Sequence, residues 1–193
     1  MQTTPDNKFL RVGIIGGLGS ETSCNFCLHV NTQFRRKMGC QPDIVLENLP
    51  VSVQAEKKLI QGKLSEEHFR LLLQAVRKLN AAEVDFLVLP CNTAHVFFPE
   101  LQRRSSKPII NIIEVCAQKC KQEKFAKVGL LATTKTIQTK LHHQELERAG
   151  IEVLVPGRRE QNELTSIILQ IINHQFSKQQ TKILEKIIIS LQK

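Results

Sequence analysis

The sequence of 193 residues contains no tryptophan and no tyrosine, and none of its apolar runs approaches the length of a membrane span. Its nine phenylalanines show no stacking pattern of the kind found on RNA-binding sheets. The N-terminal end is polar and lacks the apolar stretch of a signal peptide. We therefore expect a cytoplasmic protein with reduced thiols and without a membrane-spanning segment.

Acidic residues are comparatively scarce, with 18 Asp and Glu against 27 Lys and Arg, which gives a formal net charge of +9. Such a balance can attract nucleic acid or an anionic substrate. Here the basic residues are scattered, and only short clusters occur at 35–37, 103–104 and 158–159. The pattern favours a solvated basic surface without a nucleic-acid partner, and a nucleic-acid-associated protein is kept as a weaker alternative.

Metal-binding patterns are also absent. The six cysteines include the pairs Cys24–Cys27 and Cys116–Cys120, but both pairs lie in helix-like stretches without the glycine-rich turns of zinc sites. The histidines lack metal spacing, and the pair His142–His143 is predicted to lie on a solvated helix face. We expect no metal site.

Strand-like and helix-like segments alternate along the chain. The strand-like segments are residues 9–16, 43–49, 84–90, 108–112, 126–132 and 151–155. The helix-like segments are residues 20–38, 65–81, 92–105, 136–149, 162–172 and 179–192, with Gly150 as a helix cap. This alternation predicts an α/β fold in which helices flank parallel sheets.

The segment 87–95 reads Leu-Val-Leu-Pro-Cys-Asn-Thr-Ala-His and places Cys91 at the exit of an apolar strand. Open α/β sheets bind ligands at the carboxyl ends of their strands. The N–H groups of a following helix would favour a thiolate, so we expect Cys91 to have a depressed pKa. The alternative is an inert buried cysteine. Asn92 and Thr93 can bind a carboxylate or orient the thiol, or can simply cap the helix.

Two other loops carry candidate binding residues. Gly17 lies in a glycine-rich loop that would let the backbone approach a substrate closely, and the spacing of this loop departs from the dinucleotide-binding fingerprint. Thr133, Thr134 and Thr136 follow a strand of the second half. Their hydroxyls can hold a carboxylate or cap the next helix, and the sequence leaves both roles open.

Three segments carry a resemblance to a known family. Pro-Cys-Asn-Thr-Ala-His at 90–95 resembles the first-cysteine motif of the cofactor-independent aspartate/glutamate racemases, and is closer to the aspartate branch. Residues 12–21 and 128–136 resemble the first loop and the loop that opens the second half of these enzymes. The resemblance covers nearly the whole chain. It implies two similar lobes with the active site between them, here 1–113 with Cys91 and 114–193, divided near Ile113.

The resemblance also implies a mechanism without any cofactor. Two cysteines exchange a proton at the α-carbon of an amino acid from opposite faces, one as thiolate and one as thiol. Cys91 matches the first of them, and Gly17, Asn92, Thr93, Thr133, Thr134 and Thr136 are the candidate substrate-binding residues. The family places its second cysteine in a strand after the helix at 179–192, and this sequence has none there.

We therefore expect an amino-acid racemase of the aspartate/glutamate type, either C-terminally truncated or a natural one-cysteine relative. The chain should then racemise slowly and form a homodimer. A catalytically silent amino-acid-binding relative is the alternative. The family's substrate-binding arginine and lysine have no counterparts here, and residues 47–50 read Glu-Asn-Leu-Pro where the arginine region lies.

Overall fold

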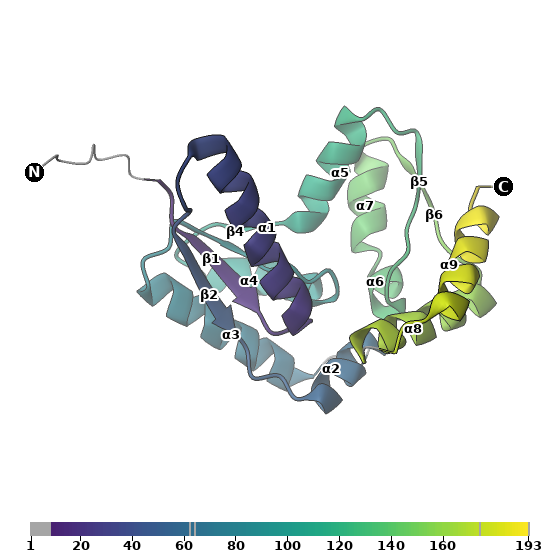
Figure 1. Cartoon of the computed structure of the whole chain (residues 1–193), viewed down its shortest axis with the longest axis horizontal. Coiled ribbons are helices and arrows are strands. Elements are labelled where there is room, and N and C mark those ends of the chain that lie inside the picture. The colour runs from purple at the N-terminus through teal and green to yellow at the C-terminus, as the bar shows by residue number, and fades with distance from the viewer. Residues whose placement is uncertain (1–8, 62, 64, 174, 193) are drawn as a thin grey trace, which may run out of the picture.

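The structure is a computed structural model that describes residues 9–61, 63, 65–173 and 175–192. The polar N-terminal end, residues 1–8, lies outside the described residues. Two lobes lie side by side in Figure 1, the N-terminal lobe on the left and the C-terminal lobe on the right. Helices α2 (Val53–Ile60) and α8 (Arg158–Ile172) meet at the bottom of this view and contact each other.

The N-terminal lobe is built on a parallel sheet with the strand order β2-β1-β3-β4. The strands are β1 (Val12–Gly16), β2 (Ile44–Asn48), β3 (Phe86–Val88) and β4 (Ile109–Ile110). Besides α2, its helices are α1 (Ser20–Met38), α3 (Glu66–Ala81), the 3-10 helix η1 (Thr93–Phe97) and α4 (Phe98–Arg104). The predicted α/β class, with a parallel sheet flanked by helices, is confirmed.

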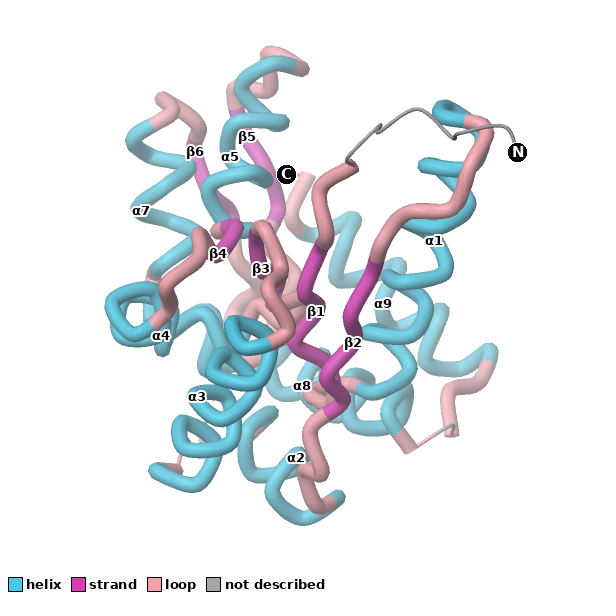
Figure 2. Tube along the Cα trace, turned by 90° about the vertical axis from the view of Figure 1, so that its left-hand side faces the viewer, coloured by secondary structure: helices cyan, strands magenta, loops and turns pink. Residues whose placement is uncertain are grey.

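Both faces of this sheet are covered. Successive side chains of a strand point to opposite faces, so Ile14 and Ile15 of β1 enter different parts of the core. Ile14 packs in a cluster with Phe26 of α1, whereas Ile15 packs in a cluster with Leu72 of α3. Figure 2 shows α1 and α3 on opposite sides of the strands. The carboxyl ends of the strands are therefore the edge at which a ligand can reach the sheet.

The C-terminal lobe carries a smaller parallel sheet. Its strands are β5 (Lys127–Gly129) and β6 (Glu152–Leu154). Besides α8, its helices are α5 (Ile112–Gln122), α6 (Thr134–Thr139), α7 (Leu141–Arg148) and α9 (Lys178–Ser190). Ala117, Leu146 and Ile151 form its buried centre. Among the described residues β5 pairs with β6 alone, and a groove of about 410 Å³ lies between β5 and α9.

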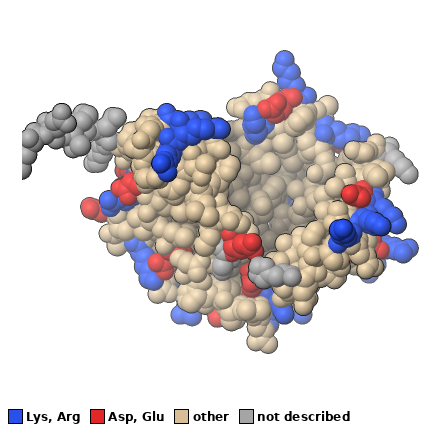
Figure 3. Space-filling model, viewed as in Figure 1, with Lys and Arg blue, Asp and Glu red and all other residues tan. Residues whose placement is uncertain are grey.

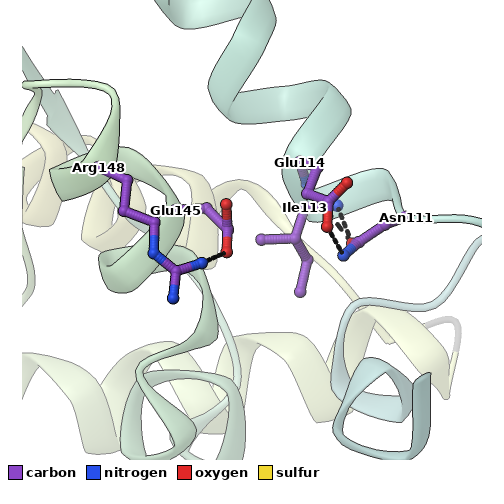
Figure 4. A network of polar contacts seen from close by, with 5 residues as sticks. All are labelled: Asn111, Ile113, Glu114, Glu145 and Arg148. Carbon is purple, nitrogen blue, oxygen red and sulfur yellow. Dashed lines mark hydrogen bonds and ion pairs between the residues drawn. The ribbon is translucent and has the colours of Figure 1, made fainter. Parts of the chain in front are cut away.

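The two lobes join at the start of α5. Asn111 caps this helix, because its side-chain oxygen accepts the N–H of Ile113 at 3.1 Å. The Asn111 amide also donates to Glu114 at 2.8 Å. In Figure 4 the Ile113 side chain lies between this cap and the ion pair of Glu145 and Arg148 on α7. The proposed division near Ile113 thus falls in the first turn of α5, which packs against α7.

The helices depart from the sequence prediction at four places, one of which is the start of α8 at Arg158 in place of residue 162. Helix α2 was not predicted. The segment 92–105 begins as the 3-10 helix η1. Pro99 has no N–H with which to make an α-helical hydrogen bond to the carbonyl oxygen of His95. That oxygen instead accepts the N–H of Phe98, which is the 3-10 pattern. The segment 136–149 divides into α6 and α7 at Lys140, which has a left-handed φ of 54°.

Candidate active site

A cleft of about 300 Å³ opens between the two lobes. Its lining comes from the loops that follow β1, β3 and β5, and from helices that include α1, α2, α6, α8 and η1. The lining residues are Leu18, Gly19, Thr22, Glu56, Leu59, Pro90, Cys91, Asn92, Thr93, Leu131, Ala132, Thr133, Thr136, Ile168 and Ile172. Figure 3 shows the hollow between the lobes, with a largely tan surface and basic residues on the outer rim. The groove beside β5 has no cysteine in its described lining, so we take the cleft as the candidate active site.

Cys91 lies in this cleft two residues after Leu89, to whose carbonyl its N–H donates at 2.8 Å. Burial raises the pKa of its thiol to about 11. The N–H groups of Ala94 and Thr93 act in the opposite direction, and the negative charge of Glu56 raises the pKa further. The predicted depressed pKa is therefore wrong, because desolvation outweighs the two N–H groups. Near neutral pH the free cleft holds a neutral thiol.

His95 holds the loop that carries this cysteine. Its Nδ1 lies 2.8 Å from the carbonyl oxygen of Cys91, and its Nε2 accepts the N–H of Ile112 at 3.4 Å. The Nδ1 atom is therefore the protonated donor of a neutral ring. The ring stacks on Phe98 and is almost fully buried, and desolvation lowers its pKa. His95 thus fixes the backbone on which Cys91 stands.

A cluster of hydroxyls connects the two lobes beside Cys91. Thr93 Oγ1 lies 3.1 Å from Thr133 Oγ1 and 3.3 Å from Thr136 Oγ1. The hydroxyls of Thr133 and Thr136 lie 2.9 Å apart. Thr133 also caps α6, since its hydroxyl accepts the N–H of Thr136 at 3.2 Å. The structure thus brings together three of the candidate threonines, which the sequence separates by about forty residues.

Asn92 makes a second connection between the lobes. Its side-chain oxygen lies 3.0 Å from Nε2 of His142 on α7. The predicted solvated face for His142 is wrong, because the residue is only 5% exposed. The break at Lys140 lets Thr136 on α6 face Thr93 while His142 on α7 faces Asn92. Desolvation lowers the pKa of His142, so the neutral ring donates to the amide oxygen.

Two predicted binding residues lie outside the cleft lining. Gly17 has φ 90° and packs so closely on the chain that an added Cβ would lie 2.4 Å from the carbonyl oxygen of Leu49. It therefore fixes the first loop against Leu49, the residue that follows β2. The hydroxyl of Thr134 lies 3.0 Å from that of Thr165, so Thr134 joins α6 to α8.

Sequence reasoning missed Glu56. Its carboxylate accepts the N–H of Gly19 at 3.0 Å and lines the cleft. Glu56 lies on α2. Ser52 caps this helix, because its hydroxyl accepts the N–H of Ala55 at 3.1 Å. A serine followed by apolar residues at helical spacing, Ala55 and Leu59, was the available signal.

The remaining chemistry-bearing groups form no second centre in the described part of the chain. The six cysteines are all free thiols, and Cys91 alone lines the cleft. No group of three or more His, Cys, Asp or Glu side chains among the described residues could hold a metal ion. None of the helices in these ranges is long and apolar enough to span a membrane.

Comparisons with known proteins identify the family and the fold. The sequence model of the Asp/Glu/Hydantoin racemase family matches residues 15–192. The broad specificity amino-acid racemase RacX of Bacillus subtilis is 27% identical over 166 residues, which are 82% of this chain and 71% of RacX. An aspartate racemase homologue from Pyrococcus horikoshii is 25% identical with a TM-score of 0.71, covering 93% of this chain and 78% of its own. The aspartate racemase of Picrophilus torridus has the same fold, with a TM-score of 0.75 at 22% identity, over 94% of this chain and 75% of that one.

Proposed function

Because the chain belongs to the Asp/Glu/Hydantoin racemase family, we propose that it is an amino-acid racemase of the aspartate/glutamate type, which moves a proton at the α-carbon without a cofactor. The observation that carries the proposal is the position of Cys91 in a cleft between two lobes, beside hydroxyls from both of them. Removing an α-proton requires a base next to the α-carbon and donors for the carboxylate.

We assign the first role to Cys91 and the second to the polar residues beside it. Asn92, Thr93, Thr133 and Thr136 offer one amide and three hydroxyls to the α-carboxylate of the substrate. Gly17 and Thr134 act through their neighbours, because they fix the first loop and the start of α6.

The protonation state of Cys91 determines whether it can donate a proton to the α-carbon or remove one from it. With a pKa of about 11, the thiol is poised to deliver a proton in the free cleft. To act as a base it must first lose its own proton. The thiolate is then a strong base, because its conjugate acid is weak.

Inversion also needs a proton donor or acceptor on the opposite face of the substrate. None of the other five cysteines lines the cleft. We propose that Cys91 serves one face and that this chain inverts its substrate slowly. Loss of one of two proton-transfer groups costs about 10²–10⁴-fold in rate.

Incubation with each enantiomer of aspartate, glutamate and leucine in D₂O tests the proposal. Mass spectrometry reports exchange of the α-proton, and chiral chromatography reports inversion. We expect exchange of one enantiomer that Cys91→Ala abolishes, with little inversion. Fast inversion that Cys91→Ala abolishes would show that another residue is the second base. The variant Cys40→Ala, at an exposed thiol outside the cleft, is the matched control.

A silent amino-acid-binding protein is the second candidate, favoured by the neutral thiol and by the single cysteine in the cleft. It predicts binding of amino acids without any exchange of the α-proton. Exchange that depends on Cys91 excludes it.

A further inference from the structure

The described lining of the cleft contains one charged side chain, and this side chain is an acid, Glu56. Its Oε1 accepts the N–H of Gly19 at 3.0 Å, which holds the carboxylate at the first loop. Glu56 takes part in none of the ion pairs among the described residues. A partly buried carboxylate without a counter-ion favours a ligand that brings a positive charge.

Apolar side chains form the walls next to this carboxylate. Glu56 and Leu59 are three residues apart and share one face of α2. Ile168 and Ile172 are four residues apart and share one face of α8, which contacts α2. The cleft therefore combines the polar residues beside Cys91, an apolar wall and one negative charge.

This arrangement points to a class of substrate. Resting on the proposed racemase function, we propose that the cleft takes an amino acid with an uncharged aliphatic side chain and discriminates against aspartate and glutamate. The α-ammonium pairs with Glu56, and the side chain packs on the apolar wall formed by α2 and α8.

Charge balance excludes the other two classes of side chain. Aspartate and glutamate carry a second carboxylate, and the described lining offers it no lysine or arginine while Glu56 repels it. A lysine-like side chain would need a second acid, because the α-ammonium already occupies Glu56. The described lining holds no second acid.

Titration calorimetry with both enantiomers of leucine, aspartate, glutamate and lysine tests this assignment. The informative variant is Glu56→Gln, since the amide oxygen can still accept the N–H of Gly19 while the charge is lost. Glu185→Gln, on an exposed part of α9, is the matched control. We expect leucine to bind the unmodified protein at least about tenfold more tightly than aspartate or glutamate. Glu56→Gln should weaken leucine binding by about tenfold and leave aspartate binding little changed, and Glu185→Gln should change neither.

The outcomes separate this inference from the proposed function. Tightest binding of aspartate or glutamate would overturn the inference and leave the racemase proposal standing. Tightest binding of lysine would overturn the aliphatic assignment, because it would show that the cleft accommodates a second positive charge. Equal leucine affinity in the unmodified protein and in Glu56→Gln would show that Glu56 does not pair with the α-ammonium, and would overturn the inference. Absence of binding for every amino acid would overturn both proposals.

Discussion

The reactivity of Cys91 is set by desolvation and by two kinds of neighbour, the N–H groups that follow it and the carboxylate of Glu56. With a pKa of about 11, Cys91 should react with iodoacetamide more slowly near neutral pH than the exposed Cys24 and Cys40. Its rate should keep rising toward pH 11, because the reactive thiolate fraction of Cys91 grows until the pH reaches its pKa. Glu56→Gln should accelerate its reaction, since that charge raises the pKa. Peptide-resolved mass spectrometry measures each rate, and labelling of Cys91 ahead of the exposed thiols would contradict this account.

A second residue-scale prediction concerns the first loop. Gly17→Ala introduces a Cβ 2.4 Å from the carbonyl oxygen of Leu49, at a backbone φ of 90°. Gly39→Ala makes the matched comparison, because Gly39 has φ 73° and nothing within 4 Å of an added Cβ. We expect Gly39→Ala to cost about 1–2 kcal/mol of unfolding free energy for the left-handed backbone alone. Gly17→Ala should cost more, by about 1–3 kcal/mol of added strain. Urea unfolding measures both, and equal losses would refute the close packing.

The candidate site residues fall into two groups, those that the local sequence predicts and those whose role depends on tertiary packing. Cys91, Asn92 and Thr93 were predictable because a strand, a turn and polar residues follow one another in the sequence. The contact of Thr93 with Thr133 and Thr136 arises between lobes, and the sequence indicates only that each follows a strand. The role of Glu56 depends on where a short helix packs, which no local pattern fixes.

At the scale of elements, long segments with clear periodicity were predictable and short ones were not. The predicted helix 65–81 is observed as α3 (Glu66–Ala81), because an apolar stripe and the cap Ser65 define it. Helix α2 has eight residues, and the break between α6 and α7 falls at a lysine, where neither glycine nor proline marks it. Tertiary contacts decide such short elements.

Helix α2 gives the element-scale prediction. Ser52→Ala removes the hydroxyl that accepts the N–H of Ala55 and leaves that donor unsatisfied. The change should cost about 1 kcal/mol of unfolding free energy. Because α2 carries Glu56 and Leu59, ligand affinity should fall as well. Ser106→Ala, on an exposed loop outside the cleft lining, is the control, and urea unfolding with calorimetry reads both effects. Unchanged stability in Ser52→Ala would show that the cap contributes nothing.

At the scale of the whole molecule, few contacts hold the two lobes together around the cleft. The cleft is held by α2 against α8, by the threonine cluster and by the pair of Asn92 and His142. The family resemblance predicted that the active site lies between two lobes, and we keep the lobes as proposed at 1–113 and 114–193. Which side chains meet there is a property of packing, and the sequence pattern alone does not specify it.

The last prediction is that two copies of the protein associate through the groove between β5 and α9. Leu131 and Ile188 line it and are 37% and 40% exposed. The edge of β5 away from β6 has no strand partner among the described residues, and such edges favour association. Lys127 in this groove is already paired with Glu152 at 3.0 Å, so two copies of the groove can face each other without repulsion between unpaired charges. We expect a homodimer formed by this surface.

Sedimentation velocity over a range of protein and salt concentrations tests the dimer. Higher salt should strengthen it, because the formal charge of +9 on each copy repels the other and salt screens that repulsion. Ile188→Glu should shift the protein to monomer, since two copies would bury opposed carboxylates. Leu28→Glu, at a residue 64% exposed on α1 of the other lobe, should leave the dimer intact. A monomer at every concentration, or equal disruption by both variants, would place no interface at the β5 edge.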